Sequence, residues 1–319
     1  MAWNLGANDL ANAMATSVGS RALRVWQATL IAAFLNLAGA VVFGSRVTHT
    51  VAKGIVPIDL LAPHVLALGA LAVLLSAALF LVLSTHWGLP VSTTHAIVGA
   101  MTGFGLVALG WNDISWPVLG EITGSWIISP ILGGFVAYLI YRFFRAVILS
   151  RVNDESLPKV ESVFAILQIA SASYVAFAHG SNDVANAIAP LSVVFGYANQ
   201  STPLWLLLFG GAGIAIGTAT WGYRVMKTVG TDITKITPVS GFSAEIAAAT
   251  SILLFSSLGV PVSTTHTVVG AVIGVGLAHG IEALNLRTLR NIFLSWVFTV
   301  PVAAGVAALL FVIFRAVGL

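Results

Sequence analysis

Residues 6–13 read Gly-Ala-Asn-Asp-Leu-Ala-Asn-Ala, and residues 180–187 read Gly-Ser-Asn-Asp-Val-Ala-Asn-Ala. The two copies lie 174 residues apart (180 − 6). A second pair follows in the same order. Residues 89–95 read Leu-Pro-Val-Ser-Thr-Thr-His and residues 260–266 read Val-Pro-Val-Ser-Thr-Thr-His, at an offset of 171 (260 − 89). Two motif pairs in one order and at nearly constant spacing predict a duplicated structural unit.

The composition of the 319 residues indicates a membrane protein. Charged residues make up 8% and apolar residues 58%, and the mean hydropathy is +0.98. A soluble domain carries about 25% charged residues, so a soluble enzyme, a nucleic-acid-binding protein and a disordered chain are excluded. The sequence predicts an all-α polytopic protein that crosses the bilayer several times. Cysteine is absent, which removes disulfides, thiolate nucleophiles and cysteine metal sites.

The repeats divide the chain into a first repeat at residues 1–145, a polar linker at 146–160 and a second repeat at 161–319. If the loop after the first Asn-Asp motif is cytoplasmic, only Arg46, Lys53 and Arg315 of the 14 basic residues fall on the outer side. That distribution satisfies the positive-inside rule when the repeats have opposite orientations. The prediction is therefore two inverted-topology repeats, with a cytoplasmic linker and an outer C-terminus.

Several predicted helices are broken or re-entrant. Gly88-Leu89-Pro90, Gly259-Val260-Pro261 and the region 179–182 interrupt apolar stretches, and free backbone groups at membrane depth must be sheltered in protein or water. An apolar stretch at 163–178 leads into the second Asn-Asp motif, but only residues 1–5 precede the first. We therefore expect the first repeat to lack a half-helix. Because the polar motif follows so soon, no cleavable signal peptide is expected.

The Asn-Asp motifs place acids at membrane depth, where a charged group is costly and indicates function. On a helix, residues three and four apart share one face. Carboxylate and amide oxygens grouped this way suit Na⁺ or a bound proton. The alternative is that these groups join helices by hydrogen bonds. The predicted cation ligands are Asp9, Asn12, Asp183 and Asn186, with Asn8 and Asn182 beside them.

The Pro-Val-Ser-Thr-Thr-His motifs predict an anion site. Proline fits the first turn of a helix, which places the following hydroxyls beside free N–H groups and the positive end of the helix dipole. The alternative is ordinary N-capping by Ser or Thr. Six hydroxyls from two motifs would be enough to surround a tetrahedral oxyanion; they belong to Ser92, Thr93, Thr94, Ser263, Thr264 and Thr265.

The two motif types together predict symport, because the acids would repel an anion unless cations lie between them. Neither motif contains Lys or Arg. Glu245, an isolated acid in an apolar helix, is a further candidate for ion coupling. Its expected counterpart in the first half is Asn36, which cannot supply charge.

With these motifs the chain resembles the inorganic phosphate transporter (PiT) family over almost its whole length. The resemblance implies a central phosphate site between inverted repeats, import across the cell (plasma) membrane, and symport with Na⁺ or H⁺ without any other cofactor. It implies a coupling role for Glu245. The phosphate-binding residues that it implies are Asn8, Ser92, Thr93, Thr94, Asn182, Ser263, Thr264 and Thr265.

Two alternatives remain open from the sequence. The same family includes sulfate transporters, so the substrate could be sulfate or another oxyanion. An intramembrane enzyme acting on lipid phosphates is disfavoured, because the acids occur as symmetric copies without a nucleophile or metal cluster at fixed spacing. The sequence leaves open whether the protein forms a homo-oligomer.

Overall fold

The computed structural model describes residues 1–221 and 233–318, without the side chains of 10–12 and 53. The basic residues Arg224 and Lys227, counted in the topology argument, lie outside this description, as does the side chain of Asn12. All described elements are helical, and seven of them are long and apolar enough to span a membrane, which confirms the predicted class. The main helices are α1 (Ala2–Leu5), α2 (Ala11–Gly19), α3 (Val25–Gly54), α4 (Pro63–His86), α5 (Thr93–Ala108), α6 (Trp116–Val147), α7 (Leu157–Val194), α8 (Leu204–Trp221), α10 (Pro238–Ser257), α11 (Thr264–His279) and α12 (Leu286–Ala316).

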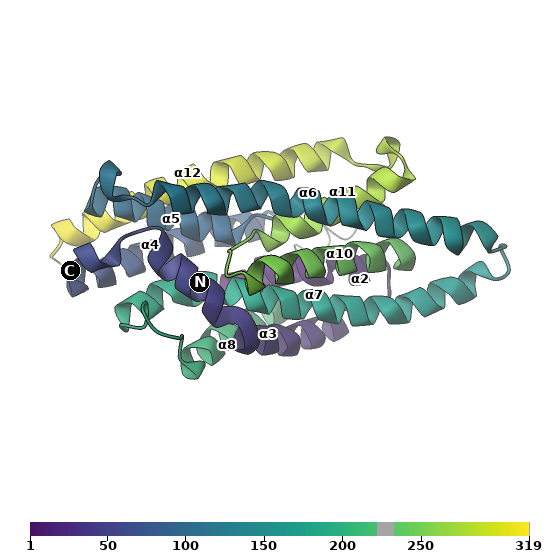
Figure 1. Ribbon diagram of the computed structural model, residues 1–319, viewed down its shortest axis with the longest axis horizontal. Helices are drawn as coiled ribbons and strands as arrows, with labels where there is room; N and C mark the ends of the chain where they lie inside the picture. Colours follow the sequence, from purple (N-terminus) through teal and green to yellow (C-terminus); the bar gives the residue numbers. More distant parts are fainter. Residues whose placement is uncertain (222–232, 319) are drawn as a thin grey trace.

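Corresponding helices of the two halves run in opposite directions. Figure 1 shows α6 and α12 antiparallel, with α5 and α11 pointing toward opposite ends of the molecule. These directions are those expected of inverted repeats. The halves are interlocked, since α6 packs against α10 and α11 while α12 packs against α4 and α5. The predicted linker at 146–160 overlaps both flanking helices, because α6 continues to Val147 and α7 begins at Leu157.

Both breaks at the Gly-X-Pro sequences are confirmed. Helix α4 ends at His86 and α10 at Ser257, and the chain then turns at Gly88 (φ +65°) and Gly259 (φ +74°). A positive φ suits glycine because it has no Cβ. Helices α5 and α11 have 16 residues each, against 32 for α6. They therefore begin in the interior of the bundle, with both N-termini toward the middle of the molecule (Figure 1).

The predicted break at the second Asn-Asp motif is wrong, because α7 continues through it without interruption. Gly180 serves a different purpose there: a Cβ on it would lie 1.9 Å from the backbone oxygen of Asn36. The glycine permits the close crossing of α3 and α7. The first copy of the motif differs, since residues Gly6–Leu10 form a π-helical turn (η1) between α1 and α2. Such π-helical turns frequently occur at functional sites.

The expected pairing of Asn36 with Glu245 is also wrong. Asn36 lies on α3, which follows the first Asn-Asp motif as α8 follows the second. Glu245 lies on α10, which precedes the second Gly-X-Pro break as α4 precedes the first. The two Pro-Val-Ser-Thr-Thr-His motifs are 171 residues apart, and at that offset the counterpart of Glu245 is Leu74 on α4 (245 − 171). The acid at 245 therefore has no polar counterpart in the other half.

Candidate functional site

The site lies where the N-termini of α5 and α11 meet the two Asn-Asp motifs. Its side chains are almost completely buried: Asp9 is 1% exposed and Asp183 is 2% exposed. The amides of Asn8, Asn182 and Asn186 and the hydroxyls of both Ser-Thr-Thr runs are buried as well. The predicted residues are thus brought together inside the protein, apart from Glu245 and from the undescribed side chain of Asn12.

Each half builds the same contacts within itself. The Thr93 hydroxyl donates to the Asp9 carboxylate, and the Thr264 hydroxyl donates to Asp183 Oδ2 at 3.1 Å. The backbone N–H of Val91 donates to Asn8 Oδ1 at 3.4 Å. In the second half, Val262 N–H donates to Asn182 Oδ1 at 3.2 Å. In both halves, therefore, the asparagine hydrogen-bonds to the backbone just before α5 or α11, and the aspartate hydrogen-bonds to the first threonine of that helix.

The second threonine of each motif crosses to the other half. Thr265 Oγ1 donates to Asp9 Oδ1 at 3.0 Å and is within 3.1 Å of the Val91 carbonyl oxygen. Thr94 Oγ1 donates to the Val262 carbonyl oxygen at 3.0 Å. Asn186 Nδ2 donates to Thr94 Oγ1 at 3.1 Å. These contacts join the two halves into a single polar centre.

The centre is dominated by oxygen acceptors and negative charge. The Asp9 and Asp183 carboxylates bring two acidic groups to it, and the carbonyl oxygens of Val91 and Val262 accept from Thr265 and Thr94. Oxygen ligands of this kind suit hard cations. The two helix N-termini contribute partial positive charge from the other side. Carboxylates, carbonyls and helix starts in one buried space can hold cations and an anion together.

His179 is a member of the site that the sequence reasoning left unassigned. Its Nδ1 lies 3.1 Å from Asp183 Oδ2, one helical turn away on α7. The counterpart at the motif offset is Leu5 (179 − 174), so the first half has no such group. A histidine four residues before the aspartate, on the same helical face, was the available signal.

Ser92 and Ser263 behave as the capping alternative predicts. Their hydroxyl oxygens accept from the backbone N–H of His95 and His266, both at 3.2 Å. The two serines therefore fix the starts of α5 and α11. Of the threonines that follow, Thr93, Thr264 and Thr265 contact the acids.

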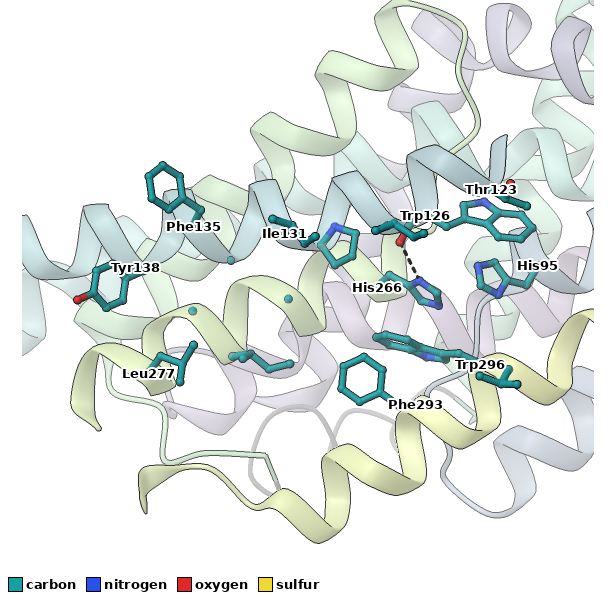
Figure 2. Close-up of a pocket in the computed structure, with 17 residues that line it drawn as sticks. His95, Thr123, Trp126, Ile131, Phe135, Tyr138, His266, Leu277, Phe293 and Trp296 are labelled. Atoms are coloured by element: carbon teal, nitrogen blue, oxygen red, sulfur yellow. Dashed lines mark hydrogen bonds between the residues drawn. The ribbon is translucent and has the colours of Figure 1, made fainter. Parts of the chain in front are cut away.

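Near the starts of α5 and α11, four aromatic rings follow one another in contact (Figure 2): Trp126, His95, His266 and Trp296, with the two histidines meeting edge to face. We call this row the four-ring stack. His95 lies 3.7 Å from Trp126 and His266 lies 3.5 Å from Trp296, measured between ring centroids, while the two histidines are 4.3 Å apart. Trp296 Nε1 donates to the Pro90 carbonyl oxygen at 3.2 Å. The Thr-Thr-His histidines thus pack against two tryptophans, one of which also holds the backbone before α5.

Glu245 has a separate polar environment on α2, α7 and α10. Its Oε1 accepts from Thr16 at 2.5 Å and from Ser17 at 2.6 Å. Gln168 Nε2 also donates to Oε1 at 3.2 Å, and Ser171 donates to Oε2. Glu245 is 2% exposed. Four donors around one buried carboxylate stabilise its charged form. The polar residues of α7 that face this way, Gln168 and Ser171, were not identified from the sequence.

Comparison with known proteins places these motifs in context. The profile of the phosphate transporter family matches residues 5–307. A protein of Thermococcus kodakarensis to which phosphate permease activity has been ascribed is 41% identical, over 100% of this chain and 96% of the relative. The chloroplastic inorganic phosphate transporter 2-1 of Arabidopsis thaliana is 36% identical, over 97% of this chain and 69% of that protein. A solved structure described as the sodium-dependent phosphate transporter superposes with a TM-score of 0.93 at 38% identity, covering 99% of this chain and 96% of its own.

Proposed function

The chain belongs to the phosphate transporter family, and from that membership we propose that it imports inorganic phosphate by symport with Na⁺ through the buried centre between its two halves. The observation that carries the proposal is the twofold Asp–Thr contact at two converging helix starts. We place the protein in the plasma membrane with the linker cytoplasmic and the C-terminus outside. As a member of a transporter family it is a carrier and not an enzyme.

We propose one cation position in each half. In the first, the ligands are the Asp9 carboxylate and the Thr93 and Thr265 hydroxyl oxygens, which already lie around it. In the second, they are the Asp183 carboxylate and Thr264. A threonine that donates its hydrogen to a carboxylate keeps oxygen lone pairs for a cation. Asn12 and Asn186 are proposed as further oxygen ligands.

The phosphate is proposed to bind between these cations. The donors are the N–H groups at the starts of α5 and α11 together with the Ser92, Thr94 and Ser263 hydroxyls and the amides of Asn8 and Asn182. A helix N-terminus favours an anion, but two buried carboxylates oppose one, so phosphate should bind only when cations neutralise them. Cation and anion binding are then coupled, which is what symport requires.

The experiment that tests the function is uptake of labelled phosphate into proteoliposomes under separately imposed Na⁺ and pH gradients. We expect an inward Na⁺ gradient to drive accumulation and a pH gradient alone to drive little. Accumulation with the pH gradient alone would assign the coupling ion as H⁺ and contradict the Na⁺ proposal. No accumulation under either gradient would contradict the transport function.

Competition assays in the same vesicles identify the substrate. Arsenate has the shape and protonation of phosphate, and we expect it to compete strongly. Sulfate is fully ionised at neutral pH and has no proton to donate to Asp9, Asp183 or a neighbouring carbonyl oxygen, so we expect weak competition. Strong inhibition by sulfate with none by arsenate would favour the sulfate permease alternative.

For Glu245 we propose a second ion position on the pathway. Ser171, which binds Glu245, precedes Asp183 by 12 residues on the continuous helix α7, or about 18 Å along its axis, toward the linker end. Four neutral donors surround the carboxylate. Because no basic side chain is among these donors, a cation can be its charge partner.

Glu245→Gln is therefore expected to make uptake less steeply dependent on Na⁺ concentration, while phosphate binding at saturating Na⁺ stays within about threefold of wild type. The hydroxyls of Thr16, Ser17 and Ser171 can rotate to accept from the new amide, so folding should be retained. The matched control is Glu121→Gln, an exposed acid on α6. An unchanged Na⁺ curve in the Glu245 variant would make its carboxylate a helix-packing group.

A further inference from the structure

A groove with a volume of about 780 Å³ lies between α6, α11 and α12, and the four rings line one end of it (Figure 2). Its walls are apolar, and several of them face outward: Ile131 is 66% exposed, Phe135 61% and Val297 70%. In a membrane-spanning bundle such a surface is covered by lipid chains. The proposed transport site does not use this groove.

The groove is long enough to take an acyl chain across the hydrocarbon of one lipid leaflet. On α6 its wall extends from Thr123 to Tyr138, which is 15 residues or about 22 Å of helix. Half of the hydrocarbon core of a bilayer is about 15 Å thick. The inner end is closed by His95, His266 and the two tryptophans. The other end lies toward the linker, beside Tyr138 and Leu277 (Figure 2).

Three arginines lie near the linker end of the groove. The Arg142 guanidinium lies 5.9 Å from the ring centroid of Tyr138. Arg145 Nη1 donates to the Ala278 carbonyl oxygen at 3.0 Å, next to groove-lining Leu277. On α12, exposed Arg290 precedes the groove residue Phe293 by three positions and so shares its face. Arginine pairs well with phosphodiester oxygens, and basic residues at this depth attract anionic lipids.

We propose that this groove binds one anionic phospholipid from the leaflet on the linker side. One acyl chain lies between α6 and α11 and ends against the four-ring stack, and the lipid phosphate pairs with Arg142, Arg145 and Arg290. The groove wall includes α11, whose first residues, Thr264 and Thr265, contact Asp183 and Asp9. The bound lipid therefore holds the helix that positions half of the polar centre.

The charge part of the proposal is tested by native mass spectrometry of the purified protein after reconstitution with phosphatidylglycerol or phosphatidylcholine. Wild type should retain phosphatidylglycerol preferentially. Each arginine near a headgroup contributes about fivefold to affinity, so Arg142→Gln combined with Arg145→Gln should lower retention about 25-fold. The matched control is Arg315→Gln, because Arg315 also lies 5.9 Å from an aromatic ring, that of Phe311, but near the other end of α12.

The groove itself is tested by filling it. Ile131→Trp places a large side chain in the groove from an exposed position and should displace the lipid, leaving retention at least about 10-fold lower. Ile128→Trp is the control, since Ile128 is 55% exposed on the same helix but does not line the groove. Thermal unfolding of all four variants verifies that they are folded.

Two results would overturn the proposal. One is equal retention of phosphatidylglycerol and phosphatidylcholine by wild type, unaffected by the arginine and Ile131 variants. The other is occupancy by a second copy of the chain. Because the chain has no cysteine, Ile131→Cys introduces a single thiol, and efficient disulfide cross-linking of two copies in vesicles would assign the groove to a dimer interface. A lack of cross-linking together with selective retention of phosphatidylglycerol supports a lipid as the occupant of the groove.

Discussion

Replacing Asp9 with Asn is expected to lower Na⁺-driven phosphate uptake by about 100-fold or more. The Asp9 carboxylate accepts hydrogen bonds from Thr93 of its own half and from Thr265 of the other. A charge-assisted contact contributes about 1.5–3 kcal/mol, which corresponds to roughly 10- to 100-fold in affinity. The substitution weakens both contacts and removes the charge that we propose the cation neutralises.

The measurement is the initial rate of phosphate uptake into proteoliposomes as a function of Na⁺ concentration. Asn keeps the size of the side chain and an oxygen acceptor, so the variant should remain folded. Asp113→Asn, at an exposed acid between α5 and α6, is the control and should transport like wild type. If Asp9→Asn keeps the wild-type Na⁺ curve, Asp9 is no cation ligand and its contacts with the threonines serve helix packing.

Gly180→Ala is expected to destabilise the fold strongly. The added Cβ would lie 1.9 Å from the backbone oxygen of Asn36, and real Cβ contacts below 3.0 Å are essentially absent from proteins. Since the obstacle is backbone, no side chain can rotate away, and α3 and α7 would have to separate along their crossing. We expect a loss of about 3 kcal/mol or more, at the upper end of the overpacking range.

Thermal unfolding of the purified protein measures this loss, together with the yield of monodisperse material. The control is Gly124→Ala on α6, where nothing lies within 4 Å of the added Cβ. Alanine is the better helix former, so this variant should be neutral or more stable by about 0.5–1 kcal/mol. Equal melting temperatures for the two variants would show that α3 and α7 do not cross as closely as described.

The duplicated motifs made the architecture predictable from the sequence. Gly-X-Pro before a run of hydroxyl residues is local information, and it predicted that helices begin at the hydroxyl residues. Helices α5 and α11 do begin there, at Thr93 and Thr264, but the prolines precede the helices and do not lie in their first turns. The repeated motifs also indicated which polar residues would meet, because polar and acidic residues that occur twice at membrane depth need partners there. The structure then shows how they meet: the first threonine contacts the aspartate of its own half, and the second crosses to the other half.

What the sequence could not provide depended on packing between distant segments. Glycine beside polar residues commonly ends an apolar helix, which is why residues 179–182 were predicted to be a break. In the structure Gly180 instead allows the backbone of Asn36 on α3 to approach α7 closely. The partners of Glu245 lie on two helices, α2 and α7, that are far from α10 in the chain. Asn36 and Glu245 were paired because their flanking residues are similar. The order of the helices places the two residues in different parts of the repeat. The groove between α6 and α12 has no sequence motif at all.

The most direct test of the central proposal is the affinity of the purified protein for phosphate, measured by isothermal titration calorimetry with and without saturating Na⁺. If cations and phosphate share one buried centre with Asp9 and Asp183, Na⁺ should raise phosphate affinity at least about 10-fold. Phosphate should raise Na⁺ affinity by the same factor, and Asp9→Asn should abolish the effect. Phosphate affinity that is the same with and without Na⁺ would contradict the account.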